Sequence, residues 1–187
     1  MKPLVLASIV ILISATVAVA QPGGNIAVYA DTNAISCDLT DIGVTICQYH
    51  IVHMFIPNGV TSSSFKIDTN HQGVYLGYIN KFIGVIGDPL TGTLVTYGEC
   101  LSLPTHILTI TYLCQGLTPP CGYMSVVGNP NAIPPGLKAT DCGSLEDRVV
   151  IDAQGYTSYI NNDGSCPCMS PIPVQETTWG QVKALYQ

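Results

Sequence analysis

The sequence predicts an all-β fold, an antiparallel β-sandwich reinforced by disulfides, and three observations carry this prediction. Short strand-like runs follow one another along most of the chain and are separated by clusters of turn residues. Only 10% of the residues are charged while 47% are hydrophobic, a balance that excludes a disordered chain. All eight cysteines lie beyond the first twenty residues, and an even number of cysteines favours a disulfide framework.

Residues 1–20 are expected to be a secretory signal peptide. Lys2 provides a positive start, an almost unbroken apolar run follows, and Ala18 and Ala20 form a small-x-small cleavage site. The alternative is an uncleaved membrane anchor, for which this apolar run is at the short limit. We therefore expect a secreted protein, extracellular or periplasmic, that starts at Gln21 and has no membrane attachment after cleavage.

Residues 21–170 are predicted to form the sandwich domain. In its clearest strand, His106, Leu108 and Ile110 are expected on one face and Thr109 on the other. Many short antiparallel strands at this spacing are typical of a sandwich or barrel. The eleven expected strands are residues 26–30, 45–56, 63–68, 74–79, 82–86, 93–98, 105–113, 122–127, 137–141, 148–152 and 156–160.

Two disulfides are predicted from expected turns and hairpins. Cys37 and Cys47 are equidistant from a likely turn position, so we expect them to pair. Cys121 and Cys142 flank two strands that, as a simple antiparallel hairpin, would set these cysteines opposite each other. Each closure would stabilise the fold by about 3 kcal/mol.

For the other four cysteines the sequence leaves the pairing open. Cys100 with Cys114 is one option. Cys166 and Cys168, which flank Pro167, either bond each other in a tight ring or reach back to the body. Because this Cys-Pro-Cys follows a loop and not a strand before a helix, we expect a structural role for it and no redox or metal role.

No catalytic residue, cofactor site or metal site is predicted. His50 and His53 are three residues apart in a strand, so they point to opposite faces and are not neighbouring ligands. His53 is expected to be a hydrogen-bonded core histidine, whereas His71 and His106 have no acidic or cysteine partner near them in the sequence. Asp41 is expected to cap a turn. No nucleophile motif of the Gly-x-Ser-x-Gly type occurs.

The preferred function is a secreted, non-enzymatic interaction or surface module that binds protein or glycan. With Lys2 removed, five basic residues stand against twelve acidic ones, which excludes nucleic-acid binding. The alternatives are a secreted hydrolase acting on polysaccharide or peptide, and a structural subunit of a surface layer or filament. Facing carboxylates in a cleft would favour the hydrolase, a flat apolar patch the binder, and a long unpaired edge strand the polymer.

Several short motifs carry a resemblance to a known group of proteins. They are Cys37, Val52-His53, the Gly-Asp-x-x-Thr-Gly turn at 87–92, Cys166-Pro167-Cys168 and a terminal Thr-Trp-Gly-x-Val-Lys-x-Leu-Tyr within 177–186. Together they resemble a group of uncharacterised secreted bacterial β-sandwich proteins, and the body is loosely similar to immunoglobulin-like and cohesin-like sandwiches. The resemblance implies a fold and a compartment, and it brings no activity with it.

Residues 171–187 are predicted to form a proline linker and a short amphipathic helical tail. Thr178 and Gln181 make a capping box. So short a helix is not stable alone, so we expect it to pack on its own sandwich; the alternative is a recognition peptide for a partner. The apolar stripe of the tail consists of Trp179, Val182, Leu185 and Tyr186.

Deletion of residues 177–187 tests the role of this tail. If the tail packs on the sandwich, its loss should lower the melting temperature by several degrees, because about 1–2 kcal/mol of stability is removed. Unchanged melting together with loss of export, retention or assembly would show that the tail is a partner peptide.

Overall fold

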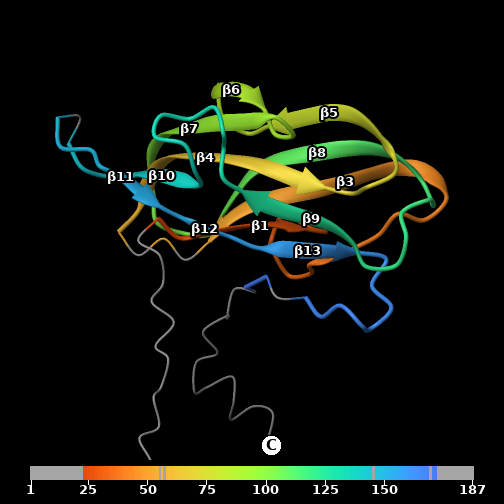
Figure 1. Ribbon diagram of the computed structural model, residues 1–187. Coiled ribbons are helices and arrows are strands. Elements are labelled where there is room, and N and C mark those ends of the chain that lie inside the picture. Colours follow the sequence, from red (N-terminus) through yellow and green to blue (C-terminus); the bar gives the residue numbers. More distant parts are fainter. Residues whose placement is uncertain (1–22, 55, 57, 145, 169, 172–187) are drawn as a thin grey trace, which may run out of the picture.

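The computed structural model describes residues 23–54, 56, 58–144, 146–168 and 170–171, and all structural statements concern these residues. They form thirteen strands in two sheets that pack as a sandwich (Figure 1). This confirms the all-β sandwich. No helix within the described residues is long and apolar enough to cross a membrane. The expected signal peptide and nearly all of the tail, including Trp179, Val182, Leu185 and Tyr186, lie outside the described residues.

The first sheet contains five strands in the order β12-β1-β3-β8-β5. All neighbours are antiparallel except β1 and β12. The strands are β1 (Asn25–Tyr29), β3 (Val44–Met54), β5 (Val74–Asn80), β8 (Thr105–Gln115) and β12 (Gln154–Gly155).

The second sheet contains the other eight strands. Six follow the order β11-β10-β4-β9-β13-β2, while β7 pairs with β4 and β6 pairs with β7. The strands are β2 (Asp38–Leu39), β4 (Val60–Thr69), β6 (Gly84–Asp88), β7 (Gly92–Leu101), β9 (Gly122–Val127), β10 (Lys138–Asp141), β11 (Val150–Asp152) and β13 (Thr157–Ile160). The two-residue strands β2 and β12 were not expected, because they are too short to show any alternation.

Alternate residues of both sheets form the core between them. Ile26 and Val28 of β1, Ile51 of β3, and Phe65 and Ile67 of β4 are all buried in one cluster. Neighbouring positions in a strand point to opposite faces, so the residues between them lie on the outer sides of the sheets.

The expected hairpin of residues 122–127 and 137–141 is wrong. Both β9 and β10 run antiparallel to β4 along the same strand, with Val127 opposite Lys66 and Lys138 opposite Ser64. The chain therefore continues in one direction and makes an excursion at 129–136, which closes through backbone hydrogen bonds between Asn129 and Gly136. The turn residues at 129–136 therefore form a loop that leaves the sheet and returns to it, and they do not connect two strands of a hairpin.

Both predicted disulfide pairs are wrong as well, as is the Cys100–Cys114 option. All eight cysteines are bonded, with sequence separations from 42 to 131 residues. The turn after β2 joins two different sheets and the strands after Cys121 are not a hairpin, so local proximity in sequence does not become proximity in space. The observed pairs are Cys37–Cys168, Cys47–Cys114, Cys100–Cys142 and Cys121–Cys166. Cys166 and Cys168 thus reach back to the body.

The buried carboxylate of Asp41 joins three segments at one end of the sandwich. It accepts hydrogen bonds from the backbone N–H groups of Gln115, Gly116 and Thr118 and from the Thr118 hydroxyl. Asn161 donates to the carbonyls of Asp41 and Thr118 and accepts from the Asp41 N–H. Burial raises the pKa of a carboxyl, but the hydrogen bonds outweigh burial and hold the pKa of Asp41 at about 2.

Substitution Asp41→Asn should lower the free energy of unfolding by about 2–3 kcal/mol, because an amide cannot accept all four hydrogen bonds and carries no charge. In the wild type this stabilisation should be complete above pH 4 and be lost as the pH falls towards 2, since the unfolded chain binds the proton first. Urea unfolding with disulfides intact measures both effects. The control is Asp38→Asn at an exposed position, which should change stability by less than about 0.5 kcal/mol; equal losses in the two variants would contradict this role of Asp41.

Candidate functional site: the outer side of the five-stranded sheet

The outer side of the first sheet is divided into a covered half and an open half. On the covered half, Ala27, Tyr29, Val52 and Met54 form a second buried cluster with Ala34 and Cys37 of the loop after β1. Cys168 packs against this cluster, and the Tyr29 hydroxyl donates to the Pro171 carbonyl. The loop after β1 and the segment at 166–171 therefore cover β1 and the end of β3.

The open half lies on the start of β3, the end of β8 and β5, and we call it the open face. Strand register sets Ile46, Leu113 and Val74 in one row across it, and Gln48, Thr111 and Gly77 in the next. Val44 and Ile79 extend the face at its two ends; the exposed fractions are 80% for Val44, 55% for Ile46, 49% for Val74 and 63% for Ile79. None of these positions carries a charge.

His50 and His106 stand at the border between the two halves. His50 lies opposite Tyr29 on one side and Thr109 on the other, and Thr109 lies opposite Ile79. The two imidazole rings are 5.3 Å apart between centroids. His50 Nδ1 is 2.9 Å and His106 Nε2 is 3.0 Å from the same atom, Thr109 Oγ1.

The expectation that His106 shares a face with Leu108 and Ile110 is wrong, and a β-bulge is the reason. Between the pairs Ile51–Leu108 and Val52–His106, Ile107 is an extra residue in β8. One extra residue reverses which side chains face outwards. His106 therefore shares the outer side with His50, a proximity that the local sequence pattern does not reveal.

The pKa values of both histidines are lowered, so both rings are neutral near pH 7. Burial is the main cause for each. For His50 the neighbouring His106 lowers the pKa further, while Asp31 opposes the shift. For His106 a backbone hydrogen bond at Leu108 opposes the shift and Lys81 adds to it.

The other two histidines have structural roles. His53 is fully buried on the core face, as predicted, and its two nitrogens contact the Tyr97 hydroxyl and the Gly23 carbonyl. Burial lowers the pKa of His53 to about 4, against the opposing effect of the Gly23 hydrogen bond. His71 Nδ1 accepts from the Gly73 N–H, so the neutral ring donates through Nε2 to the Tyr49 hydroxyl.

Two groups of three potential metal ligands occur among the described residues, and neither can hold an ion as it stands. They are Asp41, His71 and Cys114, and Cys121, Asp163 and Cys166. The cysteines of both groups are in disulfides, and a disulfide sulfur is not the thiolate that metals bind. The Asp41 carboxylate is also already engaged by four donors.

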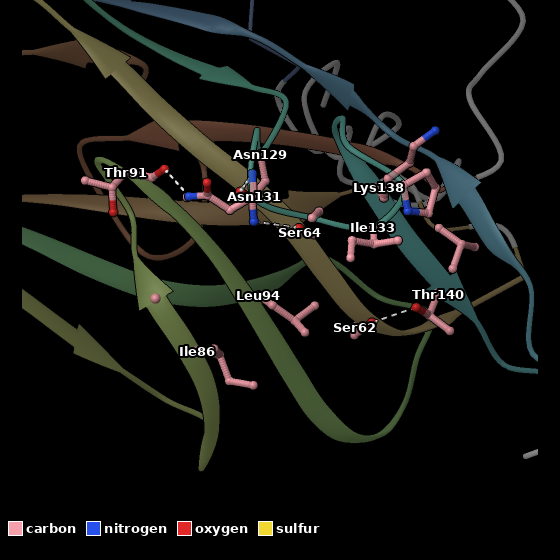
Figure 2. Close-up of a pocket in the computed structure, with 15 residues that line it drawn as sticks. Ser62, Ser64, Ile86, Thr91, Leu94, Asn129, Asn131, Ile133, Lys138 and Thr140 are labelled. Carbon is pink, nitrogen blue, oxygen red and sulfur yellow. Dashed lines mark hydrogen bonds between the residues drawn. The ribbon is translucent and has the colours of Figure 1, made fainter.

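A groove lies on the outer side of the other sheet, between the excursion and strands β4, β6, β7 and β10 (Figure 2). Its volume is about 520 Å³. Asn129 donates to the Ser64 hydroxyl and to the Thr93 carbonyl, which holds the excursion on the sheet. The groove is lined by Ser62, Ser64, Ile86, Gly87, Thr91, Gly92, Leu94, Asn129, Asn131, Ala132, Ile133, Pro134, Lys138, Thr140 and Val150. These residues include no carboxylate, histidine, cysteine or aromatic ring.

Comparisons with known proteins find similar solved structures, all at low sequence identity. No protein-family model matches the chain, and neither does any curated protein. The sixth cohesin of scaffoldin B from Acetivibrio cellulolyticus, solved in complex with a dockerin, is 9% identical at a TM-score of 0.49 over 75% of this chain and 99% of that chain. The third ScaB cohesin from R. flavefaciens, also solved with a dockerin, is 9% identical at a TM-score of 0.48 over 74% and 96%. At such low sequence identities and TM-scores, the binding residues of these cohesins cannot be assigned to positions in this chain.

Proposed function

We propose that this chain is a secreted, non-enzymatic interaction module that binds a partner protein through the open face. The observation that carries the proposal is the exposure of Val44, Ile46, Val74 and Ile79 on a face without charges. Exposed apolar side chains gathered on one face mark interaction sites in soluble proteins, because leaving them in water is unfavourable. A partner with a flat, apolar and uncharged surface would fit it.

The hydrolase alternative finds no support in the described residues. A glycosidase needs two carboxylates several ångströms apart across its cleft, and no carboxylate lines the groove. Asp41 and His53 are both occupied by hydrogen bonds within the fold. Glycan binding is also disfavoured, because neither the groove nor the open face offers an aromatic ring on which a sugar could stack.

The filament alternative needs a long edge strand, and in the described part of the chain the longest is β5, which pairs only with β8. Its register is shifted between Tyr75 and Gly77, and Gly77 has a φ of 127°. A bulge in an edge strand disrupts the row of backbone groups that a second strand would need. The Tyr75 and Tyr78 hydroxyls also reach across to Asp88 and Gly87 at the end of β6. A binding face therefore explains β5 better than a polymerising edge.

Photocrosslinking from defined positions tests the proposal. A photoreactive residue at Ile46 or at Val74 should capture the same protein in the secreting cell, whereas one at exposed Glu99, off the open face, should not. With that partner purified, Ile46→Asp should weaken binding at least about tenfold, because a charge is then desolvated in an apolar interface. Its melting temperature should stay close to that of the wild type, since Ile46 is on the surface.

Two outcomes would contradict the proposal. One is capture of the same protein from Glu99 and from the open face alike. The other is hydrolysis of polysaccharide or peptide by the purified protein.

A further inference from the structure

Two imidazole rings converge on one point at the border of the open face. Strand register places His50 of β3 beside Thr109 of β8, and the bulge at Ile107 turns His106 to the same side. One nitrogen of each ring lies within 3.0 Å of Thr109 Oγ1. This arrangement borders the proposed partner surface, but metal binding to it can be measured without a partner and does not depend on the proposed function.

We propose that His50 and His106 form a binding site for a transition-metal ion of the Zn²⁺ class. Neutral imidazole is the commonest protein ligand for such ions. Both rings are partly buried and partly open to solvent, so an ion can reach them. Thr109 is 6% exposed and forms the floor between them.

The shared hydroxyl gives the two ring nitrogens opposite roles, one as acceptor and one as donor. The Thr109 hydroxyl has one proton, so it donates to one ring and must accept N–H from the other. An ion bound by both nitrogens would replace their hydrogen bonds to Thr109, and the ring that donates its N–H would first move that proton to its other nitrogen. No proton then has to leave the pair, since both rings are already neutral.

The surrounding charges act on the site in opposite directions. The carboxylate of Asp31 lies close enough to His50 to favour positive charge there, while Lys81 disfavours it at His106. With two protein ligands, the remaining positions of a four-coordinate ion would be taken by water or by a side chain of a docked protein. The site would therefore have moderate affinity alone.

Calorimetric titration of the chelator-treated protein with ZnCl₂ tests the proposal. The wild type should bind one ion per chain, and His50→Ala and His106→Ala should each weaken binding at least about tenfold. The control variant His71→Gln removes an imidazole outside the pair and should keep the wild-type affinity. If an alanine variant is unstable, His50→Gln and His106→Gln replace it.

The effect of the Lys81 charge on zinc affinity gives a second test. Lys81→Ala should tighten zinc binding, because it removes a positive charge whose electrostatic effect disfavours positive charge at His106. CaCl₂ should give no binding at this site, since Ca²⁺ prefers oxygen ligands. The proposal is overturned if the wild type shows no saturable zinc binding, or if zinc binding is unchanged in both histidine variants.

Discussion

The disulfides of the Cys-Pro-Cys segment are the constraint on which the surface of this protein depends. Cys168 is joined to Cys37, 131 residues away, and Cys166 is joined to Cys121. In the chain-entropy view, closing loops of this length contributes about 4–5 kcal/mol each. The Cys37–Cys168 bond holds Cys168 against the outer side of β1 and β3, while the Cys121–Cys166 bond ties the same segment to the residue before β9. The half of the first sheet that this segment does not cover is the open face.

The same sheet shows how one strand irregularity can create a site. The bulge in β8 keeps Ile107 in the core and turns His106 outwards, towards His50. Because His50 lies between Tyr29 of the covered half and Thr109 of the open half, the histidine pair connects the two halves. A ligand at this pair would therefore contact the border of the surface at which we propose a partner binds.

The local sequence pattern predicts the longer strands, but it predicts neither the two-residue strands β2 and β12 nor which strands pair with each other. Alternation and turn residues predicted β3 and β8 within two residues at either end. The pairing of β9 and β10 with β4 depends on contacts over about 60 residues or more, which no local pattern records. Cys37 and Cys47 were paired by nearness in sequence, although the chain between them crosses from one sheet to the other. His50 and His106 were missed for the same reason, combined with a bulge that reverses the alternation.

Peptide mapping of the non-reduced protein is the most direct test of this account, because the disulfides decide which half of the sheet is covered. The account predicts peptides that join Cys37 to Cys168 and Cys121 to Cys166. Peptides that join Cys37 to Cys47 and Cys166 to Cys168 would contradict it, since the segment at 166–171 would then be released from β1 and the open face would have no defined border.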